Sequence, residues 1–168
     1  MKNIFTILAL TIVFSVNAQI DDNSNDVSAT GSFSIAMGRS TIASGGRSTA
    51  MGYNTEASGT DSTTMGYRTT ASGSRSTAMG SGTTASDFGS LVIGLYNSSG
   101  SSVTSSATSF DTANTAFVIG NGTSATASDA FKVLFNGDTY VSSSLYLGGT
   151  KITSTATELN LLSGATSL

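Results

Sequence analysis

The feature that most constrains this chain is a fourteen-residue repeat that runs from Gly31 to Gly94. Each unit reads Ser/Thr-x-Ala-x-Gly-x-x twice over, so it consists of two similar halves. Two glycine columns mark the ends of these halves: Gly38, Gly52, Gly66, Gly80 and Gly94 in one, and Gly31, Gly45, Gly59 and Gly73 in the other. A unit this short cannot bury a core alone, so the repeat predicts stacked units, as in a solenoid.

The spacing inside each unit favours strands over helices, because small residues alternate at a period of two. A coiled coil would need apolar residues at positions a and d of each heptad, where this sequence has Ser, Ala and Gly. We therefore predict an all-β fold, a parallel β-solenoid of 14-residue coils. Each coil would hold two strands of about five residues and stack ~4.8 Å from the next. The glycines that close each half would supply the positive φ of its turns.

The alternation also assigns side chains to two faces. Ser or Thr, Ala and Gly share the inner face, because only small residues fill a thin lumen at protein packing density. The outer face of the first strand carries an apolar column with two flanking residues: Met37, Met51, Met65, Met79 and Ile93, with Ile35 and Leu91 beside them. A long exposed apolar stripe marks a partner surface, and we predict that identical chains meet there in a symmetric oligomer. The outer face of the second strand is polar.

Four arginines follow the glycine columns, in positions where we expect turns: Arg39, Arg47, Arg68 and Arg75. One interpretation is that they keep the solenoid soluble and protect its edges from pairing. The other is that they form a cationic face for acidic glycans or matrix proteins. The sequence leaves both interpretations open.

The composition excludes most catalytic chemistry. The 168 residues include no His, Cys, Pro or Trp, and only 10% are charged. Without His and Cys there is no Ser-His-Asp triad, thiol nucleophile, disulfide or zinc site. The Met column is therefore interpreted as packing rather than as a metal array. Ser and Thr fill roughly a third of the positions, where an average domain has more charge.

Few function classes remain after this exclusion. Glu56, Asp61 and Asp87 would act as a glycosidase pair only if two of them converged, and the spacing does not place them together. The net charge of −3 and the absence of a basic run argue against nucleic-acid binding. We predict no enzyme activity, no cofactor and no metal.

The N-terminus has the pattern of a secretory signal peptide over residues 1–18. Lys2 precedes an apolar run from Ile4 to Val16, and small residues at Val16 and Ala18 favour cleavage after Ala18. The run of about 13 residues is shorter than the roughly 20 that a membrane-spanning helix needs. We therefore predict an exported chain with no integral membrane span after cleavage, in which residues 19–28 form a linker.

The doubled unit Ser-x-Ala-Met-Gly/Thr-x-Ala-Ser-Gly resembles the head repeats of trimeric autotransporter adhesins, the YadA-like family. The resemblance runs roughly from Ala29 to Gly94, and we assign residues 29–97 to this region. It implies a left-handed parallel β-roll and a homotrimer joined through the apolar wall. It also implies adhesion to a matrix or cell-surface protein or glycan, from the bacterial cell surface, the outer membrane or a secreted state. We recognise no counterpart of the family's heptad stalk or four-stranded anchor.

Past the repeat, residues 98–115 form a Ser/Thr-rich insertion that breaks the fourteen-residue phase. Ala116 to Gly120 restates the strand Val92-Ile93-Gly94, so we predict a β-rich cap or transition element over residues 116–149. We predict that Phe110 and Phe117 cap the solenoid end. A strand is predicted in which Phe131, Val133 and Phe135 alternate, with Lys132 outward. Turns are predicted at Asn121-Gly122, Asn136-Gly137 and Gly148-Gly149.

The C-terminal segment, residues 150–168, is a separate piece. Lys151 to Gly164 resembles a segment common in bacteriophage tail fibres. This resemblance implies an alternative function, a phage or prophage tail-fibre-like structural or receptor-binding fragment, against which the export signal weighs. Thr155 and Glu158 have the spacing of a capping box, which predicts a short helix through Leu162.

Overall fold

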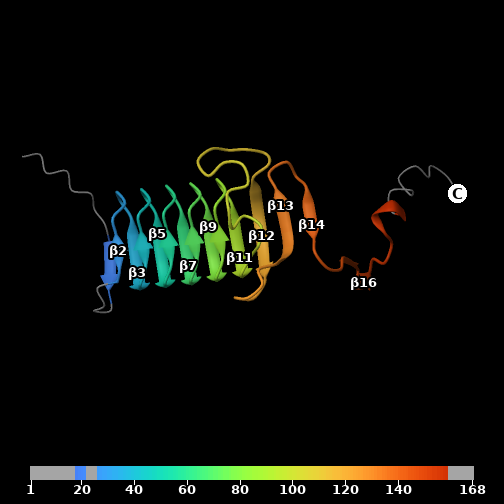
Figure 1. Cartoon of the computed structure of the whole chain (residues 1–168), viewed down its shortest axis with the longest axis horizontal. Coiled ribbons are helices and arrows are strands. Elements are labelled where there is room, and N and C mark those ends of the chain that lie inside the picture. Colours follow the sequence, from blue (N-terminus) through green and yellow to red (C-terminus); the bar gives the residue numbers. More distant parts are fainter. Residues whose placement is uncertain (1–17, 22–25, 159–168) are drawn as a thin grey trace, which may run out of the picture.

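The structure, a computed structural model, describes residues 18–21 and 26–158. Over these residues its regular secondary structure is almost entirely β, with a nine-stranded sheet, a five-stranded sheet and a two-stranded hairpin. Figure 1 shows the strands side by side along the long axis of the molecule, with the C-terminal segment extending beyond them. The prediction of an all-β solenoid is confirmed.

Each coil of the solenoid contributes one strand to each of the two larger sheets. The long strands are β1 (Ala18–Asp21), β3 (Ile35–Arg39), β5 (Thr49–Tyr53), β7 (Thr63–Tyr67), β9 (Thr77–Ser81) and β11 (Leu91–Leu95), and the same sheet continues through β12 (Thr115–Asn121), β13 (Asp129–Leu134) and β14 (Thr139–Val141). The short strands are β2 (Ser28–Ala29), β4 (Ile42–Ala43), β6 (Glu56–Ala57), β8 (Thr70–Ala71) and β10 (Thr84–Ala85).

Neighbouring coils pair in parallel and in one constant register. Met37 pairs with Met51 in the long-stranded sheet, and Ala43 pairs with Ala57 in the short-stranded sheet, so each residue lies beside the one fourteen positions later. The 14-residue coil is therefore confirmed. The predicted length of the second strand is wrong, since it has two residues instead of about five. Ser44 and Gly45 both donate their N–H groups to the carbonyl of Ala57, which turns the chain away directly after Ala43.

Two of the ranges assigned from the sequence contain strands that the repeat pattern alone did not place. β1 pairs in parallel with β3, and β2 pairs with β4, so residues 19–28 include strand as well as connecting chain. Val27 beside β2 is only 5% exposed and packs on the alanines of the first coils. The predicted signal peptide lies outside the described residues except for Ala18, which begins β1.

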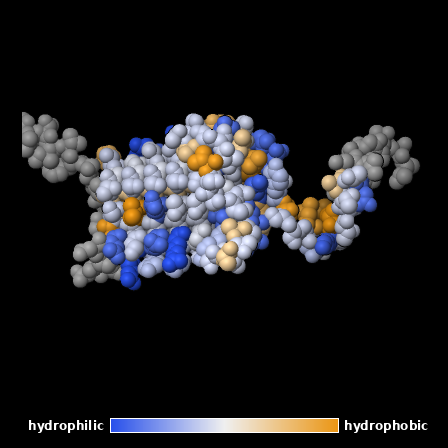
Figure 2. All heavy atoms as spheres, viewed as in Figure 1, coloured by the Kyte–Doolittle hydropathy of each residue, from blue (hydrophilic) through white to orange (hydrophobic). Residues whose placement is uncertain are grey.

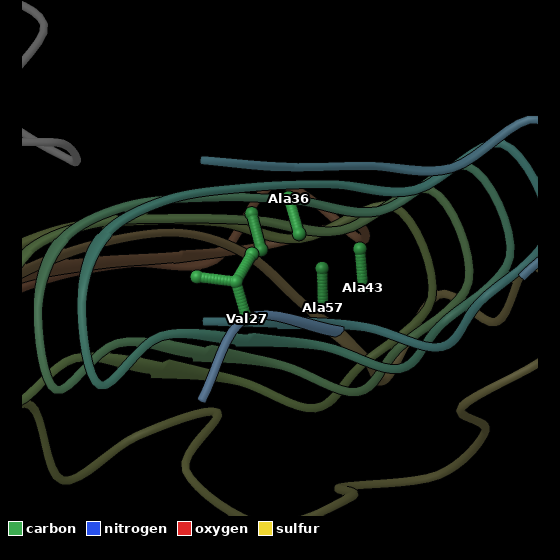
Figure 3. Close-up of a cluster of buried hydrophobic side chains, with 5 residues drawn as sticks. Val27, Ala36, Ala43 and Ala57 are labelled. Atoms are coloured by element: carbon green, nitrogen blue, oxygen red, sulfur yellow. The ribbon is translucent and has the colours of Figure 1, made fainter. Parts of the chain in front are cut away.

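The lumen between the two sheets is filled by small side chains, as predicted. Ala36, Ala43 and Ala57 are fully buried, and Figure 3 shows them with Val27 inside the flattened coil. The Ser and Thr columns are buried with them, for example Ser34 and Thr41. Several lumen hydroxyls have no hydrogen-bond partner: Ser34, Thr41, Ser48, Thr55, Ser62, Thr64 and Thr69. Small volume is therefore the property that these positions share, since Ala, Ser and Thr all occupy them.

Both glycine columns are required by the close approach of neighbouring coils, which corrects the prediction that they serve to supply turn conformations: a Cβ on Gly38 would overlap the Gly52 carbonyl oxygen. Gly38 has φ near +119°, but it lies within β3 rather than in a turn. Gly45 has no positive φ, so the close approach alone requires glycine there. A Cβ there would overlap the carbonyl oxygen of Gly59 and lie 2.6 Å from its carbonyl carbon, so the coils could not stack this closely.

The left-handed positions of the turns are occupied mainly by other residue types. Positive φ values near 60° occur in two columns, one in each turn of the coil: Phe33, Arg47, Asp61 and Arg75, and Ser40, Asn54 and Arg68. Gly82 and Gly89 hold the corresponding positions in later coils. Such a conformation is unfavourable for a residue with a Cβ, by about 1–2 kcal/mol. From Arg47 onward, the N–H of each of these turn residues compensates in part by bonding the preceding coil, as Arg47 does to Ser32 at 2.7 Å.

The insertion at residues 98–115 lengthens one coil without changing the register beyond it. Leu91 pairs with Phe117 and Gly94 with Gly120, which confirms that the strand around Val118 restates the one around Val92. The predicted Phe cap is wrong: Phe110 is 61% exposed and packs edge-on against Phe135, and Phe117 pairs with Leu91 on the outer face of the sheet. Val92 and Val118 fill the lumen at this end, and both are fully buried.

Buried polar side chains hold the insertion in place. Asp87 accepts hydrogen bonds from the N–H groups of Thr104 (2.6 Å) and Thr115 (2.7 Å). Asn114 accepts from Ser105 and Ser106 and donates to the Ser106 carbonyl at 2.7 Å. Asp87 and Asn114 are fully buried. Their bonds add to the backbone hydrogen bonds that join the insertion to the neighbouring coils, such as those from Ser86 to Gly100 (2.8 Å) and from Phe88 to Ser106 (2.9 Å).

A side chain also ends the short-stranded sheet. In earlier coils the backbone of the short strand bonds the next coil, as Thr70 donates to Thr83 at 2.8 Å. At Thr84 the partner is the amide of Asn97, which accepts from the Thr84 N–H at 2.8 Å and donates to the Thr84 carbonyl at 2.9 Å. Asn97 is 3% exposed. It takes the place of a further strand, so this sheet stops at β10 while the other continues to β14.

The remaining turns divide between confirmed and wrong predictions. Asn136-Gly137 joins β13 to β14, and Gly148-Gly149 joins β15 (Tyr146–Leu147) to β16 (Thr150–Lys151), both in antiparallel pairs. The Asn121-Gly122 prediction is wrong, because a longer loop connects β12 to β13 and Gly122 bonds the Leu95 carbonyl instead.

The predicted capping box is confirmed at the start of a helical turn at residues 156–158. Glu158 accepts from the Thr155 N–H at 2.7 Å, and its own N–H donates to the Thr155 hydroxyl at 3.2 Å. The hydrogen bonds that the Thr155 N–H and hydroxyl donate to the Glu158 carboxylate lower the pKa of Glu158. The predicted continuation of this helix to Leu162 lies outside the described residues.

Candidate interaction surface of the long-stranded sheet

The outer wall of the long-stranded sheet carries the predicted apolar column. Because Ala36, Ala50 and Ala78 face the lumen, their sequence neighbours face outward. All seven predicted residues lie on this wall: Met37, Met51, Met65, Met79, Ile93, Ile35 and Leu91. Met65 is 36% exposed and the other members of the Met column are half-buried, while Ile35 and Leu91 are each 37% exposed. Their role in binding another chain stays a prediction.

The apolar column extends past the repeat, which the sequence analysis did not include. Ile93 pairs with Ile119, Ile119 with Phe131, and Phe131 with Val141, so these residues continue the row of methionines across β12, β13 and β14. Phe117 and Val133 continue the adjacent row. The similarity of Val118-Ile119-Gly120 to Val92-Ile93-Gly94 was the sequence signal that could have placed Ile119 in this row. The predicted outward orientation of Lys132 is wrong: Lys132 lies opposite Val118, on the lumen side of the sheet, with its Nζ 4.2 Å from the Tyr140 ring centre.

The outer wall of the short-stranded sheet is polar by comparison. Its outward residues in successive coils are Ile42, Glu56, Thr70 and Thr84, of which Ile42 is 41% exposed. In the view of Figure 2 most of the solenoid has intermediate hydropathy, with strongly hydrophilic residues along its lower edge and hydrophobic residues gathered at the insertion and the C-terminal segment. The solenoid therefore has one wall with a continuous apolar row and one without.

The four predicted arginines lie at two opposite edges of the solenoid. Arg47 and Arg75 lie in the turn before the long strand, while Arg39 ends β3 and Arg68 lies in the turn after β7. Arg47 forms a bidentate ion pair with Asp61, with N···O distances of 2.6 and 2.8 Å. The hydrogen bond from Arg47 lowers the pKa of Asp61, and the more distant Arg75 acts in the same direction. Arg75 also stacks on Phe88, 5.2 Å from the ring centre.

The structure does not bring the three candidate carboxylates together. Glu56 is exposed on the short-stranded sheet, Asp61 is engaged by Arg47, and Asp87 is buried beneath the insertion. In the described part of the chain there is no pocket and no cluster of three metal-ligating side chains. Over the same residues, no helix has the length and apolar character to cross a membrane.

A fourth carboxylate, which sequence reasoning missed, joins the insertion to β13. Asp129 accepts hydrogen bonds from the Ser98 N–H (2.9 Å), the Ser98 hydroxyl (2.8 Å) and the Ser99 N–H (2.8 Å). Burial opposes the ionisation of Asp129, but the hydrogen bonds from Ser98 and Ser99 outweigh it and lower the pKa. The role of Asp129 is therefore structural.

A solenoid with small residues inside and an apolar row outside defines a class of β-roll repeat proteins. Comparison with known families identifies the YadA head domain repeat in two copies, at residues 29–55 and 57–94. These matched residues and the β-solenoid that they form fit the YadA-like head-repeat family, whose head is a structural, adhesin-type domain rather than an enzyme family. Comparisons with curated proteins and with solved structures found no match.

Proposed function

We propose that this protein is an exported, non-enzymatic adhesin head. In this proposal three chains form a homotrimer of left-handed β-rolls, and the assembly attaches a bacterial cell to a matrix or cell-surface protein or glycan. The YadA head repeats support the class of protein. The observation that carries the trimer is the apolar row on the outer wall of the long-stranded sheet, from Met37 through Val141.

The row favours association because it is a long, regular and apolar surface. The methionines lie at one height in successive coils, so identical walls can pack against one another over the whole solenoid. Flexible thioether side chains fill irregular gaps at such contacts. Burying them also removes apolar area from water, which stabilises association by ~25 cal/mol per Å².

Light scattering on the chain after signal cleavage, residues 19–168, tests the assembly. We expect three times the protomer mass for the wild type. Met51→Lys combined with Met65→Lys should dissociate it, since unpaired charges would be buried in the contact. Ile42→Lys combined with Thr70→Lys is the matched control, because it places the same two charges on the opposite wall and should leave the mass unchanged. A monomeric wild type would refute the proposed assembly.

Adhesion is tested separately, by binding of the intact assembly to immobilised matrix proteins and glycans. The lysine variant of the methionine row should lose avidity together with its mass, since linked binding sites reinforce one another. A wild-type trimer that binds none of the surfaces would argue against the adhesive role.

A further inference from the structure

The edge of the solenoid after the long strands carries an ordered stack of aromatic rings and guanidinium groups. Tyr53 and Tyr67 pair in register and their rings stack 5.4 Å apart, with planes 8° from parallel. The guanidinium of Arg39 lies over Tyr53, 5.5 Å from the ring centre, and that of Arg68 lies over Tyr67 at 5.2 Å. These four residues, here called the Arg-Tyr ladder, span three successive coils, or about 10 Å at the usual strand spacing.

The ladder is exposed, and its cations are available to a ligand. Tyr53 is 38% and Tyr67 is 42% exposed, and both arginines are exposed. In the described part of the chain the ion pair found is Arg47–Asp61, at the opposite edge, so neither ladder arginine is neutralised by a carboxylate there. The carboxylate of Asp26, at the N-terminal end of this edge, accepts a hydrogen bond from Ser40 at 3.3 Å.

Stacking on the tyrosines prepares the arginines for binding. A guanidinium held over an aromatic ring still has N–H groups free for a carboxylate or sulfate, which it can bind in a bidentate manner. The rings restrict the side chains beforehand, so less conformational entropy is lost on binding. The backbone is fixed as well, because the Arg68 N–H donates to the Tyr53 carbonyl and the Asn54 N–H to the Arg39 carbonyl, both at 2.9 Å.

We propose that the Arg-Tyr ladder binds an acidic polysaccharide that lies along the solenoid edge. The described residues form no pocket, which favours an extended polymer over a small ligand. The two unneutralised cations complement carboxylate or sulfate groups, and the tyrosine hydroxyls between them can exchange hydrogen bonds with sugar hydroxyls. This inference rests on the proposed adhesive function and names a ligand class for it.

The ladder ends within the repeat. Ser81 and Leu95 follow Tyr67 in the same column, and Gly82 follows Arg68 in the adjacent turn column. The site is therefore confined to the coils that contain β3, β5 and β7. At the end of the strands it also lies at the rim of the outer wall, beside the methionine row, where polar and charged residues border an apolar contact.

Retention on immobilised heparin, with neutral dextran as the reference, tests the ladder in residues 19–168. We expect the wild type to bind heparin and not dextran, with an affinity that falls as salt is raised. Arg39→Gln combined with Arg68→Gln should weaken binding at least about tenfold, since hydrogen bonds to charged groups are worth that much. Arg47→Gln combined with Arg75→Gln removes the same charge from the opposite edge and should leave binding near the wild-type value.

Several outcomes would overturn the ladder while leaving the trimer intact. Equal losses in both double variants would indicate general charge attraction, and retention on dextran would remove the need for an anion. Tighter binding to duplex DNA than to heparin would indicate a nucleic-acid surface. A change of mass in the Arg39/Arg68 variant would place the ladder in the contact between protomers. A monomeric wild type that still binds heparin through the ladder would refute the assembly but not the site.

Discussion

The contrast between two neighbouring glycines tests how closely the coils are stacked. Gly45 faces the backbone of the next coil, where a Cβ would overlap the Gly59 carbonyl oxygen and lie 3.0 Å from that of Ser58. Around Gly46 there is no atom within 4 Å of the corresponding position, and its φ is not in the left-handed region. Gly45→Ala and Gly46→Ala therefore add the same methyl group, one residue apart, to very different surroundings.

The expected cost of Gly45→Ala follows from the bonds that hold the two coils together. To reach an ordinary contact distance the backbone must move by roughly 1 Å, which strains or breaks the ladder around it. Two hydrogen bonds join the coils there, Ser44 to Ala57 (3.0 Å) and Gly45 to Ala57 (3.1 Å), and a third, Ser48 to Gly45 (3.2 Å), closes the adjacent turn within one coil. At about 1 kcal/mol each, with the added strain, we expect a loss of about 3–5 kcal/mol. Gly46→Ala should be neutral or stabilising by about 0.4–1 kcal/mol, because it restricts only the unfolded chain.

Thermal unfolding followed by circular dichroism, at equal chain concentration, measures both effects. For a chain of this size we expect Gly45→Ala to lower Tm by about 10 °C or more, and Gly46→Ala to leave it within about 3 °C of the wild type. Gly59→Ala, one coil further along, should repeat the result of Gly45→Ala. If Gly45→Ala and Gly46→Ala melted at the same temperature, the explanation of the glycine column by close approach would be wrong.

Three further predictions concern the end of the solenoid. Asn97→Ala leaves the N–H and C=O of Thr84 without partners and should lower the unfolding free energy by about 2–4 kcal/mol in urea titrations, whereas an unchanged midpoint would contradict its role in ending the sheet. Because the folded-state pKa of Asp129 is lowered, its contribution to stability is present above the unfolded value near 3.9 and is lost as pH falls through the folded value. Asp129→Asn should therefore flatten the acid side of a plot of stability against pH, and a curve parallel to the wild type would exclude that contribution. Asp87→Ala should make residues 98–115 sensitive to limited proteolysis at temperatures where the coils stay folded, and equal digestion of both proteins would show that Asp87 does not anchor the insertion.

The solenoid was predictable because the same residue types recur at a fixed interval. Equivalent positions in successive coils, such as Ala36, Ala50 and Ala78, carry the same residue type and face the same side. The sequence pattern therefore indicates the period, the lumen and the outer row. The length of the second strand was not predictable in this way. It depends on two N–H groups that share the Ala57 carbonyl, a detail of backbone geometry without a residue signature.

The glycine columns were misinterpreted for a related reason. A regular spacing of glycines in this sequence indicates that the backbone requires glycine there. A positive φ and a close approach of another backbone both create that requirement, so the sequence alone does not separate them. Arg47 and Asp61 show that the turns accept a side chain at positive φ, while Gly45 accepts none despite its ordinary φ. Only the distance between coils separates these two cases, and that distance is a tertiary property.

The solenoid end was the least predictable part. Asp87, Asn97 and Asn114 are single polar residues outside any column, and each acts through backbone groups distant in sequence. The Arg-Tyr ladder was predicted only in part. Arg39 and Arg68 were recognised as possible ligand contacts, but the stacking of Tyr53 on Tyr67 that orders them required the register of the coils.

The constant register between coils makes the length of this head adjustable in discrete steps. Because each residue from Ile35 to Gly80 lies beside its equivalent fourteen positions later, removing or duplicating one whole unit would join matching columns and preserve both walls. Each such step would change the height of the solenoid by about 4.8 Å. Tandem duplication in the gene could therefore tune how far the distal end extends from a surface, while the lateral contact between chains gains or loses one identical layer.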